Sequence, residues 1–398
     1  MIRDRVIVCL ASRWDYDPTS KHQVMRILAR ENDVVWVNHR ASRRPRVTAA
    51  DAGAVASTVG QILRGVRRVG PRMVQFTPLV IPGARRPVTR AWNRWLLVLQ
   101  VRRAIRHVRH SADQPVQVWT FAPDGEFLAD ALRPERFLYY CVDEYTEFED
   151  LDRDAVAAAE RRVLARADVV VTTSQPLYES KRSHNANTHL VRHGVDAAHF
   201  ASALEEGLPL PTELAGIRGP MLGFFGLIHH WIDCDLLEAA ARLRPTYSFV
   251  LIGEDRQNHA GLRRCPNVHL LGRRPYGSLP AYCRAFSAGL LPFARTRMTR
   301  NVNPIKLREY LAAGLPVVST PLPEAERYWP EVRIAADAES FARACDEAVA
   351  DAVPERRRAR SRLVADETWE AVVERLSRLA DDAPTAAMPA LAAPAIAP

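Results

Sequence analysis

The sequence predicts an α/β protein with two domains, each built on a parallel β-sheet covered by helices. Short apolar runs alternate with longer helical patterns along most of the chain, which is typical of strands joined by crossover helices. A polar stretch rich in glycine and proline, residues 201–220, divides this alternation into two series. The 398 residues exceed what one hydrophobic core usually supports, and 47% of them are apolar. We therefore expect two domains and a linker at residues 201–220.

The first series predicts an N-terminal domain over residues 1–200. One helix is expected at residues 21–31, where Val24, Ile27 and Leu28 form an apolar stripe, and another at residues 154–165. Such alternation of strands and helices makes one doubly wound domain. The expected strands lie at residues 5–10, 33–38, 73–81, 116–121, 136–142 and 168–173.

The second series predicts another doubly wound domain, over residues 221–365. After residue 382 the chain is an Ala/Pro tract with no charge and no periodicity, so residues 383–398 are expected to form a disordered tail. The expected strands of the second domain lie at residues 221–226, 247–253, 267–272, 288–293, 315–319 and 332–335.

Composition limits the cellular setting. Lys and Arg (55) exceed Asp and Glu (46), so the protein favours anionic partners. No run of about 18 uncharged apolar residues occurs and the start lacks the pattern of a signal peptide, which predicts a cytoplasmic protein. The six cysteines form no C-x-x-C pair, which predicts reduced, buried thiols and neither zinc nor a disulfide framework.

Much of the basic excess lies between Arg85 and His110, where arginines interleave with Trp92, Trp95 and several aliphatic residues. This mixture suits an amphipathic helix on an anionic membrane surface, which would make the protein peripheral on the inner face of the membrane. It equally suits a crossover helix that packs its Trp and Leu side chains against its own sheet while arginine heads reach outward. The sequence leaves both interpretations open.

One segment carries most of the chemistry. A basic loop follows the strand at residues 288–293, and a helix opens at Pro304, a residue suited to a first helical position. Free N–H groups at that helix start, together with Lys306 in its first turn, favour a diphosphate. Glu309, one turn later on the same face, is placed to accept hydrogen bonds from a ribose diol. Gly314 ends the helix as a C-cap.

The string P-x-K-x-x-E-Y-L-A-A-G-x-P-V-V in this segment resembles the donor-binding motif of GT-B glycosyltransferases, above all the family-4-like bacterial exopolysaccharide and teichuronic-acid type. The resemblance implies two Rossmann-like domains facing across a cleft, with Glu309 on the donor ribose and the Lys306 region on the diphosphate. It also implies that a last helix, within residues 366–382, crosses back between the domains. Many retaining members carry a second glutamate where this chain has Asn301, so the stereochemistry stays open.

Other stretches extend the resemblance on the donor side. Residues 223–237 resemble the first strand and loop of the donor domain, where Gly226 permits close approach and His229 and His230 either donate to phosphate oxygens or pack and cap the next helix. Asn303, at the start of the motif, is assigned to the donor as well. Arg273 and Arg274 follow a strand end, where ligands of open sheets bind, and one of the two is expected to touch the nucleotide.

On the acceptor side, Asp143 and Glu144 follow an apolar strand and are the catalytic candidates. If the enzyme inverts, a partly desolvated Asp143 is the expected base, although the same residue also suits a helix N-cap. Further polar residues are placed either to line the cleft or to cap the helix that follows them. They are Asp15, Asp17, Lys21 and His22.

The resemblance predicts transfer of a hexose-type sugar from a nucleoside diphosphate sugar to a glycan, lipid-linked or small-molecule acceptor. UDP, GDP, TDP and ADP are the candidate nucleotides, and no cofactor or metal is expected because helix N-termini and basic side chains hold the diphosphate. A nucleotide-sugar epimerase of the same fold is the first alternative. A non-enzymatic basic binding protein is the second, although no basic module with stacking aromatic residues supports binding to nucleic acid.

Overall fold

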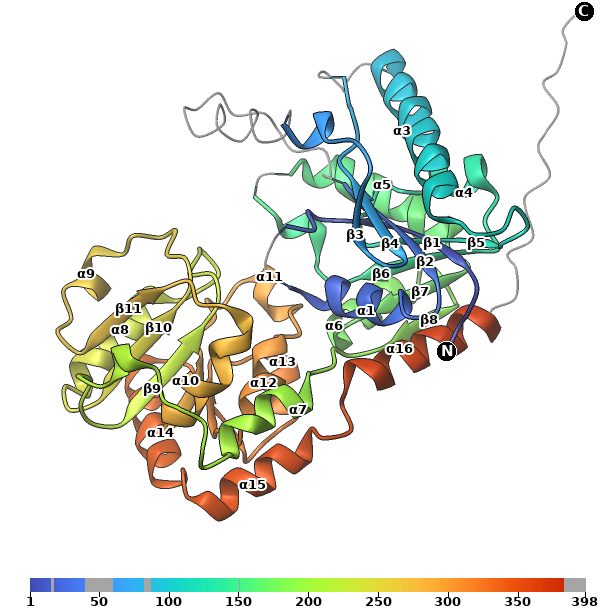
Figure 1. Ribbon diagram of the computed structural model, residues 1–398. Helices are drawn as coiled ribbons and strands as arrows, with labels where there is room; N and C mark the ends of the chain where they lie inside the picture. Colours follow the sequence, from blue (N-terminus) through green and yellow to red (C-terminus); the bar gives the residue numbers. More distant parts are fainter. Residues whose placement is uncertain (16–17, 40–59, 82–86, 150, 383–398) are drawn as a thin grey trace, which may run out of the picture.

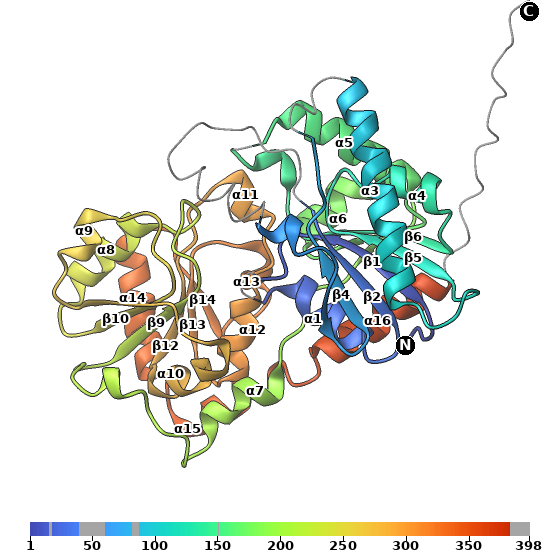
Figure 2. The same cartoon turned by 45° about the horizontal axis from the view of Figure 1, so that its top comes forward.

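A computed structural model of the protein describes residues 1–15, 18–39, 60–81, 87–149 and 151–382. Two parallel β-sheets, each covered by helices on both faces, lie side by side and are joined by the segment around α7 and by the returning C-terminal chain (Figures 1 and 2). The α/β fold class predicted from the sequence is thus confirmed. Asp17, the start of the predicted 85–110 helix and the predicted tail at 383–398 lie outside the described residues.

The N-terminal sheet has eight strands in the order β3-β4-β2-β1-β5-β6-β7-β8, all parallel except β3 against β4. Buried apolar residues cover both faces of its central strands, as parallel sheets require. The strands are β1 (Val6–Ala11), β2 (Asp33–Asn38), β3 (Arg67–Gly70), β4 (Met73–Phe76), β5 (Val116–Thr120), β6 (Arg136–Cys141), β7 (Val169–Thr172) and β8 (Thr188–Leu190).

The C-terminal sheet has six parallel strands in the order β11-β10-β9-β12-β13-β14. Its chain order reverses beside β9, so the carboxyl ends of β9 and β12 flank a switch point of the kind where open sheets bind ligands. The strands are β9 (Met221–Phe225), β10 (Ser248–Ile252), β11 (Val268–Gly272), β12 (Ala288–Leu291), β13 (Val317–Ser319) and β14 (Val332–Ile334).

Helices and short 3-10 turns connect the strands of both domains. Those of the first domain are α1 (Ser20–Leu28), α3 (Pro87–Val108), α4 (Phe127–Leu132), η1 (Tyr145–Glu147), α5 (Arg153–Arg166) and α6 (Gln175–Lys181). Those that follow are α7 (Ala197–Ala201), η2 (Ser202–Leu204), η3 (Thr212–Leu214), α8 (Cys234–Leu243), α9 (Ala260–Arg263), η4 (Tyr276–Ser278), α10 (Leu279–Ala285), α11 (Arg297–Arg300), α12 (Ile305–Ala312), α13 (Pro323–Glu326), α14 (Ala338–Ala350), α15 (Pro354–Leu363) and α16 (Trp369–Asp382).

The chain returns to the N-terminal domain at its end. α16 leaves the second domain and packs on the first sheet beside α1, burying an apolar stripe that includes Trp369, Val373 and Leu376 (Figure 1). Its approach is tight, because a Cβ placed on Gly194 would lie 2.7 Å from the backbone nitrogen of Trp369. The first domain therefore includes a helix from the far end of the chain.

Two local predictions need correction. The strand predicted at residues 73–81 ends at Phe76, and Leu79 to Ile81 form an exposed loop, because Pro78 cannot donate a hydrogen bond to a neighbouring strand. The antiparallel strand β3 was not predicted, since its four residues, RRVG, form no apolar run and none of them is buried. The cysteines agree with the prediction: all six are buried free thiols.

Candidate active site

The start of α12 presents a lysine to the carboxyl ends of the strands of the second domain. Pro304 is the N-cap of this helix and Lys306 lies in its first turn. The Lys306 side chain arches over Gly226 at the end of β9, because a Cβ placed on Gly226 would lie 2.2 Å from Cε and 2.6 Å from Nζ of the lysine. An ammonium group beside a helix N-terminus favours an anion. This arrangement suits a diphosphate above Gly226.

Two glycines make the floor of this site. Gly226 has φ +137° and Gly253, at the end of β10, has φ +144°, backbone conformations that side chains rarely adopt. A Cβ on Gly253 would lie 1.9 Å from the carbonyl oxygen of Gly226. The amide of Gly226 donates to the carbonyl of Ile252 at 2.7 Å. The two strand ends thus approach each other more closely than any larger residue permits.

Glu309 lies one turn after Lys306 and is buried, with 7% of its surface exposed. Burial raises the pKa of its carboxyl to about 7, while the positive charge of Lys306 and the nearby Tyr276 hydroxyl act in the opposite direction. That hydroxyl is itself buried, close enough to favour the ionised carboxylate but without a well-aligned hydrogen bond to a described residue. A carboxylate can accept hydrogen bonds from the two hydroxyl groups of a ribose.

His229 and His230 lie on the loop after β9. Their Nδ1 atoms are 2.5 Å apart, and the ring of His229 stacks on Trp231 with 4.6 Å between centroids. Asp233 is the N-cap of α8 through its own carboxylate, so neither histidine caps that helix. His230 is exposed and His229 half-buried, which leaves both at the edge of the donor site.

The structure distinguishes Arg273 from Arg274. Arg274 donates to Glu213 at 2.9 Å and to the hydroxyl of Tyr282 at 3.0 Å, so it ties the linker to α10. Arg273 is exposed at the carboxyl end of β11, and its positive charge helps to lower the pKa of the Glu254 carboxyl. Of the two arginines, Arg273 is the one placed for a nucleotide.

Asn303 joins the two domains. Its Nδ2 donates to the carbonyl of Thr173 in the first domain at 2.6 Å, and its Oδ1 accepts from Arg308 at 2.7 Å. Arg308, with none of its surface exposed, also pairs with Glu367 at 2.6 Å. Asn303 is predicted from the sequence to contact the donor. In the structure, both heteroatoms of its side-chain amide instead bond to protein partners at the buried contact between the domains.

Asp143 follows β6 at the carboxyl edge of the first sheet and is half-buried. Burial raises the pKa of its carboxyl, and Lys21 at the start of α1 partly offsets this effect. The N-cap of η1 is Glu144, so Asp143 does not cap that turn. His22, one of the other cleft candidates, forms a capping box with Thr19 at the start of α1.

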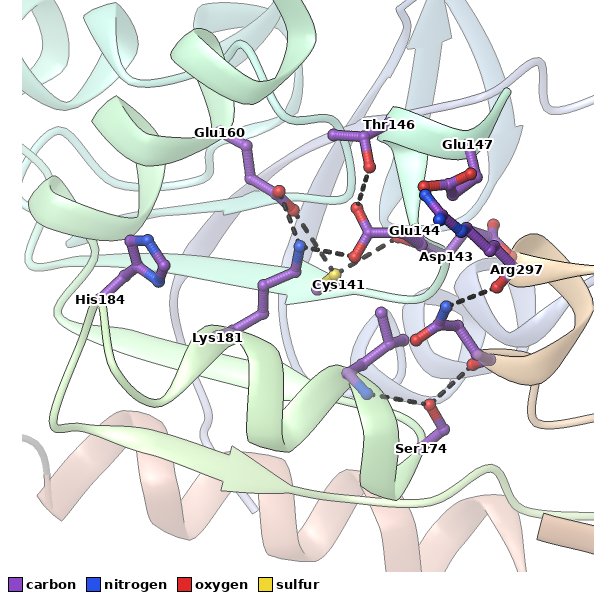
Figure 3. Close-up of polar contacts among 12 residues, drawn as sticks. Cys141, Asp143, Glu144, Thr146, Glu147, Glu160, Ser174, Lys181, His184 and Arg297 are labelled. Carbon is purple, nitrogen blue, oxygen red and sulfur yellow. Dashed lines mark hydrogen bonds and ion pairs between the residues drawn. The ribbon is translucent and has the colours of Figure 1, made fainter. Parts of the chain in front are cut away.

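Glu144 points away from Asp143 into a buried ionic cluster. Lys181 lies between Glu144 and Glu160, at 2.9 Å and 2.8 Å from their carboxylate oxygens (Figure 3). Burial acts to raise the pKa of the Glu144 carboxyl, but the Lys181 charge and the Thr146 hydroxyl outweigh it and lower that pKa. A carboxylate that has a lowered pKa and is paired with an ammonium group is a poor base. We therefore assign Glu144 a structural role in place of the catalytic role predicted from the sequence.

Sequence reasoning missed one pair at the same sheet edge. His39, after β2, pairs with Asp124, after β5, with 2.7 Å between Nε2 and Oδ1. The aspartate raises the pKa of the His39 imidazole despite the opposing effect of burial. The only available signal was that both residues follow apolar runs, since 85 positions separate them.

A cavity of about 730 Å³ opens beside Glu144 and is lined by both domains. The first domain contributes η1, α5 and α6, and the second contributes α11 with Asn301. Its charges are mixed, and Figure 3 shows several of these side chains around one space. The charged and titratable lining residues are Glu144, Glu147, Glu160, Glu179, Arg161, Lys181, Arg297, Arg300 and His184.

Comparison with known sequences supports the donor half. The family model described as glycosyl transferases group 1 matches residues 219–351. A putative teichuronic acid biosynthesis glycosyltransferase, TuaH of Bacillus subtilis, is 27% identical over an alignment of 226 residues that covers 53% of this chain and 56% of the relative. The match thus spans only a little over half of that relative.

Solved structures match nearly the whole chain. Sucrose-phosphate synthase from Thermosynechococcus elongatus aligns with TM-score 0.67 at 16% identity over 94% of this chain and 98% of its own. Anabaena HepE, in complex with UDP and glucose, aligns with TM-score 0.67 at 12% identity over 94% and 99%. A UDP-forming trehalose-phosphate synthase from Burkholderia vietnamiensis aligns with TM-score 0.66 at 13% identity over 96% and 98%. The chain has the GT-B fold of these structures, and its residues 219–351 match the family model of glycosyl transferases group 1.

Proposed function

We propose that the chain transfers a hexose-type sugar from a nucleoside diphosphate sugar to a hydroxyl group of a glycan, lipid-linked or small-molecule acceptor. The observation that carries this proposal is the placement of Lys306 over Gly226 with buried Glu309 one turn away. Lys306 and the α12 N-terminus bind the diphosphate, and Glu309 accepts from the ribose. Exposed Arg273 and the His229–His230 loop border the same donor.

UDP is the first nucleotide to test. HepE binds UDP and glucose, and the trehalose-phosphate synthase is UDP-forming. None of the relatives named above is an epimerase, so they do not favour that alternative. A nucleotide held by a lysine, a helix N-terminus and backbone glycines also needs no divalent metal, and metal-independent transfer remains part of the proposal.

The test of donor binding is a thermal-shift panel with UDP, GDP, TDP and ADP. A ligand that binds only the folded state raises Tm, by an amount set by its concentration relative to Kd. We expect one nucleotide to raise Tm, and Glu309→Ala to remove most of that shift. Absence of a shift with all four nucleotides would contradict the proposal.

The acceptor side of the proposal uses Asp143. Its carboxylate takes the proton of the acceptor hydroxyl while the hydroxyl oxygen attacks the anomeric carbon and the bond to the diphosphate breaks. A partly desolvated carboxylate with a raised pKa is a stronger base than an exposed one. This single displacement inverts the anomeric centre. The mixed-charge cavity beside the neighbouring Glu144, which Asp143 does not line, suits the hydroxyl groups of a glycan.

Asp143 is tested against its neighbour. Asp143→Asn should lower kcat about 10²–10⁴-fold with UDP binding retained, because a general base contributes to the chemical step and not to donor affinity. Glu144→Gln is the matched control, and its kcat should fall far less. Equal losses in the two variants, or a product of retained configuration, would remove Asp143 from this role.

The cytoplasmic face of a membrane is the proposed location. Six buried free thiols fit a reducing compartment. Among the described residues, no helix is both long and apolar enough to cross a bilayer. Attachment would therefore depend on the surface of α3.

A further inference from the structure

α3 carries two apolar stripes on opposite sides. The inner stripe packs on the first sheet and includes Leu97, Val101, Ala104, Ile105 and Val108, all buried. At about 100° per residue, residues spaced by three and four positions share a face, and the exposed apolar residues of the helix fall on the side opposite to this stripe. The inner stripe attaches the helix to the sheet, and the outer stripe is not buried against any described part of the fold.

The outer stripe is strongly exposed. Val88 is 69% exposed, Trp92 55%, Trp95 54% and Leu99 40%, at spacings of four, three and four residues. The two indole rings meet edge to face with 5.3 Å between centroids. Exposed large apolar side chains that gather on one surface mark an interaction site.

A loop enlarges this surface. Leu79, Val80 and Ile81 are each about half exposed, and side chains of α3 hold their backbone. Asn93 accepts from the Ile81 amide at 2.7 Å and donates to its carbonyl at 2.9 Å, and Gln100 accepts from the Leu79 amide at 2.9 Å. These bonds keep the loop beside the outer stripe.

Basic residues continue the outer face toward the C-terminal end of α3. Arg102, Arg103 and Arg106 are exposed one to two turns beyond Leu99. Arg102, Arg106 and Arg109 also line a cavity of about 270 Å³ at the side of this half of the helix. A surface that is apolar with two tryptophans at one end and arginine-rich at the other matches an anionic bilayer, which offers acyl chains next to phosphate groups.

We propose that the outer face of α3, with the loop at residues 79–81, docks on an anionic lipid bilayer. Trp92, Trp95 and the neighbouring aliphatic residues enter the interface, and the arginines bind lipid phosphate groups. The N-terminal half of α3 projects beyond the sheet in both views (Figures 1 and 2), which lets it reach a flat surface. A second copy of the chain is a poorer occupant, because its arginines would repel these. The inference adds a partner to the proposed glycosyl transfer without depending on it.

Vesicle flotation with the full chain tests the proposal. The wild type should bind vesicles of phosphatidylglycerol and phosphatidylcholine and bind pure phosphatidylcholine at least tenfold more weakly. Trp92→Ser/Trp95→Ser should lower binding to the anionic vesicles at least tenfold. Trp329→Ser is the matched control, because Trp329 is 75% exposed on the other domain, and it should bind as the wild type does.

A charge variant and a folding control complete the test. Arg103→Gln/Arg106→Gln should weaken binding to anionic vesicles and reduce its dependence on salt. Each variant should keep the wild-type UDP-induced Tm shift, so loss of lipid binding and loss of donor binding are separate results. Wild type that stays unbound, or a tryptophan variant that binds normally, would overturn the proposal. A change in oligomeric state in the tryptophan variant, measured by sedimentation, would assign the face to a second copy instead.

Discussion

Glu309 shows how one buried side chain couples stability to function. Its carboxyl is buried beside Lys306 and the Tyr276 hydroxyl, and burial raises its pKa to about 7. The ionised form accepts hydrogen bonds from a ribose diol best, and burial in the unliganded protein shifts the carboxyl toward its neutral form. The site is therefore poised so that a ligand compensates for an unfavourable buried charge.

This predicts opposite pH trends for stability and for binding. Since the folded pKa lies above the ordinary value of 4.5, folding binds a proton between the two values, and the free energy of unfolding falls by about 2.5 kcal/mol as pH rises from 5 to 8. UDP affinity should rise over the same range, as Glu309 ionises. Glu309→Gln removes both trends, and titrations of Tm and of UDP Kd against pH in the two proteins check them. Parallel pH profiles in wild type and variant would contradict this account.

The backbone conformation of Gly226 and its contact with Lys306 predict the effect of replacing this glycine. Gly226→Ala places a Cβ 2.2 Å from Lys306 Cε at φ +137°, so the lysine must move and the backbone is strained by about 1–3 kcal/mol. Loss of the UDP-induced Tm shift together with a lower Tm of the free protein is expected. Gly207→Ala is the control, because no atom lies within 4 Å of its Cβ position.

Among the helices, α3 and α16 place similar residues in different surroundings. α16 buries its whole apolar stripe on the first domain beside α1, although it comes from the end of the chain. α3 buries one stripe and leaves a second exposed. An amphipathic pattern alone does not indicate which element will cover it.

The packing of α16 predicts a large effect of one truncation. Leu376 has none of its surface exposed, so Leu376→Ala should lower the stability of the first domain by about 3 kcal/mol. Hydrogen exchange of amides in α1 and β2 should then be faster. Leu363→Ala, at a position 54% exposed on α15, should leave these amides unchanged within about 0.5 kcal/mol. Equal exchange in the two variants would mean that α16 does not stabilise the domain.

At the scale of the whole molecule, a few polar residues join the two domains. Asn303 and Arg308 link α12 to Thr173 and Glu367. Glu324 accepts from the Gln175 amide at 2.8 Å and pairs with Arg192 at 2.7 Å. In the proposed transfer, a donor bound to the second domain and Asp143 of the first domain can react only if these contacts set the distance between them.

The contacts of Asn303 between the two domains predict how the variant Asn303→Ala will behave. The variant removes the bond to Thr173 and one partner of buried Arg308, so the domains should lose their fixed arrangement and kcat/KM should fall at least tenfold. UDP should still raise Tm as in the wild type, because Asn303 does not hold the donor. Small-angle scattering should report a broader distribution of shapes. Loss of the UDP-induced Tm shift in this variant would mean that Asn303 does contact the donor.

Strands with continuous apolar runs were predicted to within a few residues, as β2 and β9 to β14 show. The helix that carries the proposed donor motif was equally predictable, because Pro304, Lys306, Glu309 and Gly314 lie on one helix and its caps. The Schellman cap is an example: the amides of Gly314 and Leu315 donate to Leu311 and Tyr310. Local periodicity and capping chemistry act over a few residues, so sequence alone is enough for them.

The sequence by itself determined two doubly wound domains, a linker between them and a donor motif at the end of a strand. Only the tertiary structure decided that Glu144 forms an ion pair with Lys181, that His39 pairs with Asp124, and which face of α3 is left exposed. These outcomes depend on partners tens or hundreds of positions away in the chain. Periodicity indicates which side of a helix is apolar. How the sheets and the returning α16 pack together then decides which element covers that side. The same packing decides which charged group lies beside a given carboxylate.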